Sequence, residues 1–296
     1  MSKAMRLDLP LIFGTVGTPL SAPKAGGSTG GVARIRELNL GALELAWVRG
    51  TTNIGDEVCA RIRAAAEIYQ VALSVHASYF FNLNATSDEM WQAGRERLLQ
   101  AARLGYKAGA TDIIFHPGSY MKQEPKAVFG VARDRLAGIA DQLIKEKIGV
   151  ILRPETMGKS ALLGTLEECI AFSQTIENVL PCVDFAHLHA RPGDGTFNSY
   201  KDFSSALKLI ADGLGPRGLN HMHVHFSGIA YGPKGEKNHL VLEESDIKYK
   251  EFFKALADCG ARGRVMSETP NMEEGAIVMQ NTYARALRAR ASAKPN

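Results

Sequence analysis

Short apolar segments alternate with longer amphipathic segments along most of the chain. Short runs of apolar and β-branched residues predict buried strands, whereas apolar residues spaced three and four apart predict helices that bury one face. The expected strands are residues 9–13, 42–47, 71–75, 112–115, 148–152, 179–183, 221–225 and 264–266. The expected helices between them include residues 54–69, 89–107, 128–147, 165–176, 200–214 and 250–258.

This alternation predicts a (β/α)8 TIM barrel of the α/β class. Eight strand-then-helix units in 296 residues match one barrel closed as a single domain. We expect the barrel to occupy residues 1–284 and a basic C-terminal tail to occupy residues 285–296. A doubly wound open sheet is the alternative arrangement of the same units.

Composition and charge narrow the class of protein without identifying its function. A hydrophobic content of 45% and a charged content of 22% are typical of a globular protein and exclude a disordered or fibrous one. No apolar run approaches the roughly 20 residues that span a bilayer, and the first ten residues lack the apolar core of a signal peptide. We therefore expect a cytoplasmic protein without a membrane partner, whereas the net charge of +4 leaves a nucleic-acid partner open.

Histidines and carboxylates follow six of the expected strands, from the third to the eighth. These residues are His76, His116, Glu155, Asp184, His223 and Glu268. Because the C-terminal ends of barrel strands form one rim, these side chains should lie close together. Any one of them alone would be interpreted as a rim histidine or a helix N-cap. Three carboxylates at one barrel mouth, however, would repel one another unless cations neutralised them, which predicts a metal centre.

The ligand types indicate the chemistry of such a centre. Imidazole and carboxylate groups without thiolate suit zinc, manganese or iron. If Glu155 bridged two ions, the pair would support hydrolysis of a phosphoester, whereas one ion held by the same ligands would support isomerisation of a sugar. The spacing also leaves open whether Asp184 and His187, three residues apart, bind the same ion.

Three histidines alternate along the seventh expected strand. His221, His223 and His225 lie on one face of this strand, because side chains alternate between its two faces. Residues two apart are separated by about 6.6–6.8 Å along a strand, so one ion would not bind all three. We expect His223 to be the metal ligand, His225 to contact the substrate or a ligand side chain, and His221 to lie deeper in the barrel.

Several short motifs occur in a characteristic order over roughly residues 9–280. The motifs are SVHASY at 74–79 with Asn82, FHPG at 115–118, RPET at 153–156, VDFAH at 183–187, MH at 222–223 and SETP at 267–270. This ordered set resembles the endonuclease IV family of apurinic/apyrimidinic (AP) endonucleases, within the xylose isomerase-like barrels. The resemblance implies a (β/α)8 fold and a zinc-dependent enzyme of DNA base excision repair, which hydrolyses the backbone 5′ to an abasic site and leaves a 3′-hydroxyl.

The resemblance also implies how the ligands are divided among three zinc ions. His76, His116 and Glu155 match the ligands of the first ion. The second ion would be bound by Glu155, as a bridge, with Asp184, His223 and Glu268. His187 and His239 match ligands of a third ion. Among all these residues, Glu155 and Glu268 are the expected catalytic groups.

One position departs from the family pattern. The family has an aspartate ligand two residues before the histidine that matches His239, and this chain has Lys237 there. A protonated ammonium cannot bind a cation, so we expect two zinc ions and leave the third open, with manganese as an alternative metal. Glu236 could replace the missing ligand, or Lys237 could itself bind a phosphate oxygen.

The expected partner is double-stranded DNA that contains an abasic site, bound by a monomer. Tyr79 and Phe80 match family positions that enter the damaged duplex, where they would stack at an unstacked step. The other expected DNA contacts are Asn82, Arg49, Lys237 and His225. Two alternatives remain beside the endonuclease: a sugar or sugar-phosphate isomerase or epimerase on the same barrel, and a weakly catalytic module that binds damaged DNA.

Overall fold

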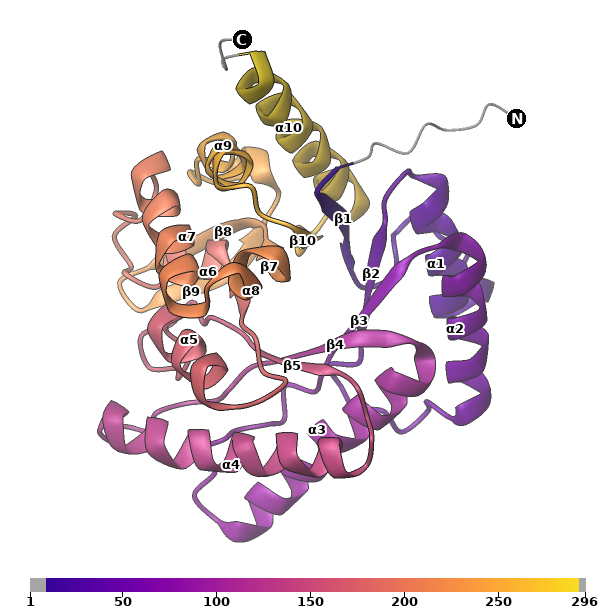
Figure 1. The fold of residues 1–296 in the computed structure, drawn as a ribbon, viewed down its shortest axis with the longest axis vertical. Helices are drawn as coiled ribbons and strands as arrows, with labels where there is room; N and C mark the ends of the chain where they lie inside the picture. Colours follow the sequence, from indigo (N-terminus) through magenta and orange to yellow (C-terminus); the bar gives the residue numbers. More distant parts are fainter. Residues whose placement is uncertain (1–8, 293–296) are drawn as a thin grey trace.

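Eight parallel strands form a barrel in the computed structural model, which describes residues 9–292 (Figure 1). The barrel strands are β1 (Leu11–Val16), β2 (Ala42–Ala46), β3 (Ala72–His76), β4 (Ala110–Phe115), β5 (Ile151–Pro154), β6 (Cys182–Asp184), β7 (Met222–Phe226) and β10 (Gly263–Ser267). Their order in the sheet is β5-β4-β3-β2-β1-β10-β7-β6. Two isolated parallel bridges, Leu152 to Val179 and Glu155 to Cys182, join β5 to β6 and close the ring. The prediction of a single (β/α)8 barrel is confirmed.

Helices surround the barrel and cover its outer face (Figure 1). They are α1 (Gly27–Glu37), α2 (Asp56–Tyr69), α3 (Asp88–Ala108), α4 (Pro125–Lys145), α5 (Leu166–Thr175), α6 (Phe185–Ala190), α7 (Tyr200–Leu214), α8 (Pro216–Asn220), α9 (Tyr249–Cys259) and α10 (Glu273–Ser292). Local sequence explains several of their ends. Thr165 and Glu168 form a capping box at the start of α5, and α3 ends where Gly109 adopts a left-handed conformation.

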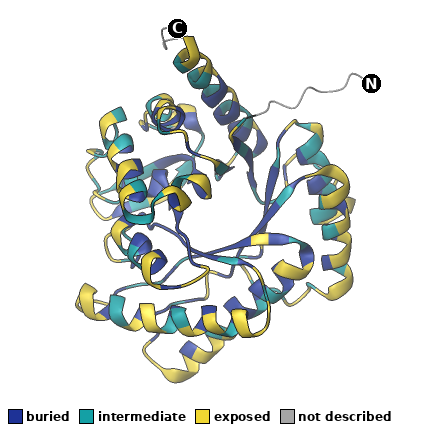
Figure 2. Ribbon diagram, viewed as in Figure 1, coloured by how far each residue is buried: buried dark blue, intermediate teal, exposed yellow. Residues whose placement is uncertain are grey.

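Burial follows the two layers of the fold. The strands and the inner faces of the helices are buried, and the outer helix faces are exposed (Figure 2). Aromatic side chains fill the space where α9 and α10 pack on the barrel: Phe226 stacks on Phe252 with ring centroids 4.5 Å apart, and Phe13 lies 5.7 Å from Tyr283. At Gly14, any side chain would overlap the Ala42 carbonyl oxygen, so the close approach of β1 to β2 depends on glycine.

Two segments differ from the sequence-based expectation. The expected boundary after residue 284 lies inside α10, so Arg285, Arg288 and Arg290 are helical residues, and 293–296 lie outside the described residues, as do 1–8. An antiparallel hairpin, β8 (Gly228–Gly232) and β9 (Gly235–Leu240), follows β7. It was missed because β9 is polar and only its first residue, Gly235, is buried. Within residues 9–292, no helix is both long and apolar enough to cross a membrane.

A buried ion-pair network lies in the barrel interior, away from the strand ends that carry the histidines. Asp112 accepts from Arg153 Nε at 2.7 Å and lies 2.9 Å from an Arg264 guanidinium nitrogen. Arg153 also donates to the Pro181 and His221 carbonyl oxygens. Burial alone would raise the pKa of the Asp112 carboxyl, but Arg264 and Arg153 lower this pKa far below its usual range. The network therefore joins strands β4, β5 and β10 from inside.

We expect Asp112→Asn to reduce the free energy of unfolding at neutral pH by about 3–5 kcal/mol, because it leaves the buried Arg153 guanidinium, and the partly buried one of Arg264, without their anion. Urea unfolding measures this change. Asp212→Asn is the matched control, since it removes an exposed ion pair with Lys208 and should cost less than about 1 kcal/mol.

The effect of Asp112→Asn should depend on pH in one direction. A carboxyl whose pKa is lowered by folding stabilises the protein above its unfolded pKa of about 3.9, and this contribution is lost as the pH falls. The difference between wild type and variant should therefore shrink in acid. Equal costs for the two variants at neutral pH would contradict the role given to Asp112.

Candidate metal centre

The polar residues at the ends of the barrel strands converge at the barrel mouth. His76 ends β3, Glu155 follows β5 and Asp184 ends β6, and all three side chains are buried. Within the described part of the chain, three overlapping sets of ligand atoms lie close enough to hold cations at this mouth. The sets are His76, His116 and Glu155; Glu155, Asp184, His225 and Glu268; and Asp184, His187 and His239.

Glu155 belongs to two of these sets and turns one carboxylate oxygen toward each. Its Oε2 lies 3.4 Å from His76 Nε2 and 3.3 Å from His116 Nε2, whereas its Oε1 lies 3.2 Å from His225 Nδ1. Burial would raise the pKa of Glu155, but His225 and His116 lower it well below its usual value. Glu155 is thus an ionised carboxylate in the position of a bridge between two ligand sets.

The structure places His225, rather than His223, in the second set. The sequence analysis expected His223 in this place, and the difference follows from the extent of β7. The strand runs to Phe226, so His225 is the histidine that pairs with Asp184 at the mouth, whereas His223 pairs with Cys182 one layer deeper. The set of Cys182, His223 and His225 is also close enough to hold a cation, but it lies beneath the three sets at the mouth.

Glu44 is a buried carboxylate that the sequence analysis missed. It lies on β2, and its Oε2 accepts from Ser74 Oγ at 2.7 Å and from His223 Nε2 at 2.9 Å. Burial would raise the pKa of Glu44, but His225 and His223 lower it well below its usual value. The available signal was a charged residue inside the apolar segment 42–47, where solvent exposure could not explain it.

Several histidines are oriented by backbone carbonyl groups. Nδ1 of His76 donates to the Ala77 oxygen at 3.0 Å, and Nδ1 of His187 donates to the Thr156 oxygen at 2.9 Å. Nδ1 of His239 likewise donates to the Glu268 oxygen at 3.1 Å. Because a carbonyl only accepts, each ring keeps a proton on Nδ1, which leaves Nε2 as the nitrogen that could give its lone pair to a cation. Histidine ligands of metals are commonly oriented in this way.

Two buried carboxylate oxygens make the donor set fit a cation. Glu155 Oε2 and Asp184 Oδ2 are inaccessible to solvent and have no hydrogen-bond partner among residues 9–292. Burial, together with the charges of Glu155 and Asp184, raises the pKa of the nearby Glu268 despite the opposing effect of His225. Unpaired buried oxygens are costly, and a divalent cation with imidazole and carboxylate ligands would satisfy them. These residues can therefore hold metal.

The third set includes a residue from the β8–β9 hairpin, and a β-bulge determines which residue faces it. Ala230 pairs with Asn238 and Tyr231 pairs with Glu236, so Lys237 is an extra residue in β9. Glu236 Oε2 lies 3.5 Å from His187 Nε2, whereas Lys237 is exposed beside Gly232. The bulge thus brings Glu236 to the face of the hairpin that carries His239.

The remaining predicted residues lie on the rim loops. Tyr79 is half exposed and its ring lies 4.9 Å from that of His116, whereas Phe80 is 66% exposed and free to contact a ligand. The pKa of Tyr79 is raised to about 12, first by burial and then by the charge of Glu268. Arg49 is exposed in the β2–α2 loop. Asn82 Oδ1 accepts from the backbone N–H groups of Asn84 and Ser119, so it braces two rim loops.

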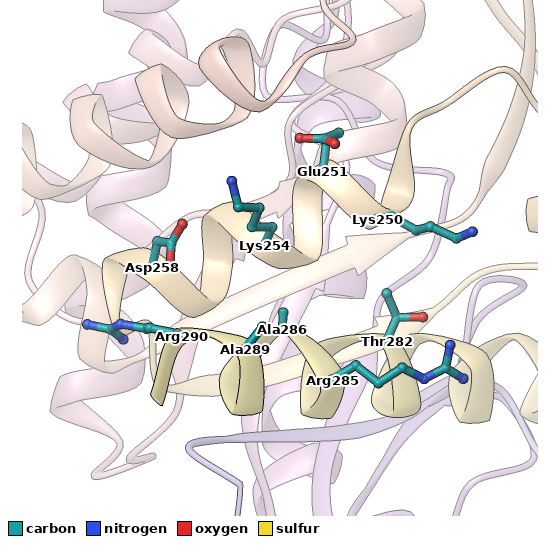
Figure 3. A pocket seen from close by; sticks show the side chains of 9 residues that line it. All are labelled: Lys250, Glu251, Lys254, Asp258, Thr282, Arg285, Ala286, Ala289 and Arg290. Carbon is teal, nitrogen blue, oxygen red and sulfur yellow. The ribbon is translucent and has the colours of Figure 1, made fainter. Parts of the chain in front are cut away.

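A separate pocket lies between α9 and α10 on the outside of the barrel (Figure 3). Lys250 and Lys254 line one side, Arg285 and Arg290 line the other, and Ala286 forms part of its floor. Tyr283 and other buried side chains of α10 face the barrel instead. No residue of this pocket belongs to the metal-capable sets, so the candidate site is the barrel mouth.

Two proteins are similar to this chain in sequence, one over almost its whole length and the other over part of it. An uncharacterised protein of Methanocaldococcus jannaschii is 34% identical over 279 residues, which cover 94% of this chain and 99% of that protein. A probable endonuclease 4 of Mycoplasma pneumoniae is 27% identical over 189 residues, which cover 62% of each chain. The second similarity therefore concerns only part of both proteins.

Solved structures share the architecture at low sequence identity. Endonuclease IV from Thermus thermophilus has a TM-score of 0.69 at 20% identity and covers 93% of this chain and 99% of its own. A D-tagatose 3-epimerase-like protein has a TM-score of 0.69 at 18% identity and covers 95% of this chain and 100% of its own. At these identities, the likeness establishes the fold and does not choose between a nuclease and an epimerase.

The family is established by a match to nearly the whole barrel. A family model described as a xylose isomerase-like TIM barrel matches residues 32–292, which include every residue of the three ligand sets. This agrees with the barrel topology and with the ordered motifs of the sequence. The chain belongs to the xylose isomerase-like TIM barrel family.

Proposed function

We propose that this protein is a metal-dependent AP endonuclease that hydrolyses the DNA phosphodiester 5′ to an abasic site and leaves a 3′-hydroxyl. The observation that carries the proposal is the position of Glu155. Its two oxygens face two different ligand sets, as a carboxylate must do to bridge a pair of cations. Paired divalent cations supply a nucleophile at neutral pH and neutralise charge on the attacking and leaving oxygens of a phosphodiester.

The residues of this chain have distinct parts in the proposal. Glu155 and Glu268 are the catalytic carboxylates, and both would hold the cations that act on the phosphate. Tyr79 and Phe80 would stack against bases at the lesion, where pairing is already lost and unstacking costs least. Exposed cations on the rim, Arg49 and Lys237 among them, would contact backbone phosphates without reading sequence.

The bulge in β9 supports a third cation position in the same proposal. Lys237 does not occupy the place of a ligand, because Glu236 faces His187 instead. The third cation would be held by His187, His239 and Glu236, with Asp184 adjacent. Zinc fits a set of imidazole and carboxylate ligands, and manganese fits it as well.

An epimerase acting on a sugar is the second candidate. One observation favours it: Glu155, Asp184, His225 and Glu268 form a complete four-residue set that could hold a single cation. The likeness to a D-tagatose 3-epimerase-like protein is consistent with this function. A single-cation enzyme, however, would leave the His76–His116 pair and the His187–His239 pair without a role, and we therefore favour the nuclease.

An incision assay tests the proposal directly. We expect the protein to cut a duplex carrying one tetrahydrofuran abasic analogue, to lose this activity with a chelator, and to regain it with zinc or manganese. Glu155→Gln should reduce incision by at least about 10³-fold, because several kcal/mol of charge stabilisation would be lost. Asp212→Asn, on the exposed surface, should leave it unchanged.

Other outcomes of this assay would decide against the nuclease. Conversion of a ketose by the metal-loaded protein without incision would favour the epimerase. Tight binding of the abasic duplex without incision would indicate a damage-binding module.

Metal analysis tests the third position. We expect three zinc ions per chain in the wild type, two in Glu236→Gln, and three in Lys237→Ala, since only Glu236 faces the ligand set. Inductively coupled plasma mass spectrometry of the dialysed proteins gives these ratios. Two ions in the wild type, or loss of one in Lys237→Ala, would overturn the assignment of Glu236.

Phe80→Ala tests the proposed contact with bases. Stacking of one base on an aromatic ring contributes about 1–3 kcal/mol, so Kd for the abasic duplex should rise about 5- to 150-fold. Fluorescence anisotropy with the metal-loaded protein measures this Kd. Ile68→Ala, which truncates an equally exposed apolar residue on α2, is the control and should leave Kd unchanged.

A further inference from the structure

Glu44 is a buried carboxylate that lies beside the metal-capable sets at the barrel mouth but belongs to none of them. It lies on β2, and the histidines that it contacts lie on β7, with β1 and β10 between these strands in the barrel. Its side chain therefore reaches across the interior. Among the described residues, no lysine or arginine pairs with it, so its charge is compensated only by hydrogen-bond donors. Burying a carboxylate without a cationic partner costs desolvation free energy, which indicates that Glu44 has a specific role.

The contacts of Glu44 divide between its two oxygens. Oε2 accepts from Ser74 Oγ at 2.7 Å and from His223 Nε2 at 2.9 Å. Oε1 lies 3.0 Å from His225 Nε2, and neither of these two buried atoms makes a hydrogen bond within residues 9–292, so each is available to the other. Ser74 and His223 thus hold the carboxylate through Oε2, which leaves Oε1 beside His225.

The opposite side of the His225 ring faces the ligand set. Its Nδ1 lies 3.2 Å from Glu155 Oε1 and 3.5 Å from Glu268 Oε1. A neutral imidazole carries its proton on one nitrogen and a lone pair on the other. A carboxylate facing Nε2 selects the tautomer with the proton on Nε2, and the lone pair on Nδ1 is then directed toward the cation.

We propose that Glu44 is a positioning residue that fixes the tautomer and ring orientation of His225, so that His225 binds a cation through Nδ1. His223 acts here as the second donor to Glu44, which explains why a buried histidine lies one layer below the ligand sets. This inference rests on the metal centre of the proposed function, and it holds for a nuclease or an epimerase alike.

Metal affinity tests the proposal without reference to activity. We expect Glu44→Gln to weaken one of the bound zinc ions by about 10- to 100-fold in competition with a chromophoric chelator, because the amide no longer selects the required tautomer. Asp212→Asn is the control: it makes the corresponding acid-to-amide change at an exposed carboxylate paired with Lys208, and its zinc affinities should stay within about threefold of wild type.

Nuclear magnetic resonance gives a second readout that needs no variant. Two-bond ¹H–¹⁵N spectra of zinc-loaded wild type should show His225 protonated at Nε2 and bound to metal through Nδ1. A proton on Nδ1, or unchanged zinc affinity in folded Glu44→Gln, would overturn the role of Glu44 while leaving the metal centre intact. A wild type that binds no zinc would overturn the metal centre and this inference together.

Discussion

Several carboxylates are buried close together at one barrel mouth, and the arrangement of the side chains around them depends on how their negative charge is neutralised. Glu155, Asp184 and Glu44 are fully buried, and Glu268 is nearly so. Among the described residues, no lysine or arginine neutralises the charge of these carboxylates. The two arginines inside the barrel, Arg153 and Arg264, pair with Asp112 instead. Histidine side chains surround these carboxylates instead: when protonated they offset the negative charge, and when neutral they offer a lone pair that could bind a cation in place of the proton.

This arrangement explains how one fold can serve different reactions. The four-residue set around Glu155 and Glu268 is sufficient for a single cation, and the outlying histidine pairs extend it in two directions. On such a barrel, additional ligands on neighbouring strands would raise the number of cations without changing the scaffold. In the proposed function, the choice between hydrolysis and epimerisation would rest on side chains such as His116 and His239, because the topology is shared by both kinds of enzyme.

The fold could be predicted from sequence because it depends on a repeated pattern, whereas parts of the site depend on single-residue differences. Eight strand segments and their strand-end histidines and carboxylates were recognisable from the alternation alone. The structure places His225 in the second set, where His223 was expected, and this assignment depends on the end of β7 to within one residue, which apolar periodicity does not define. Glu44 was missed because its partners lie on strands distant in sequence. The bulge at Lys237 exchanges which neighbour faces His187, and no local pattern in the polar strand β9 indicates it.

The join between β5 and β6 is weakly paired and lies next to the metal centre. Elsewhere around the barrel, neighbouring strands are paired over three to five residues, but here only two isolated bridges close the ring, and one of them is made by Glu155 itself. Asp184, at the end of β6, lies on the other side of this seam and is tied to it through the Thr156 hydroxyl at 2.9 Å. A cation bound by both Glu155 and Asp184 would connect the two sides of this join. Metal binding and local opening between β5 and β6 would therefore be thermodynamically linked. The β5–β6 join, where neighbouring strands are paired at the fewest residues, would then open less often when metal is bound.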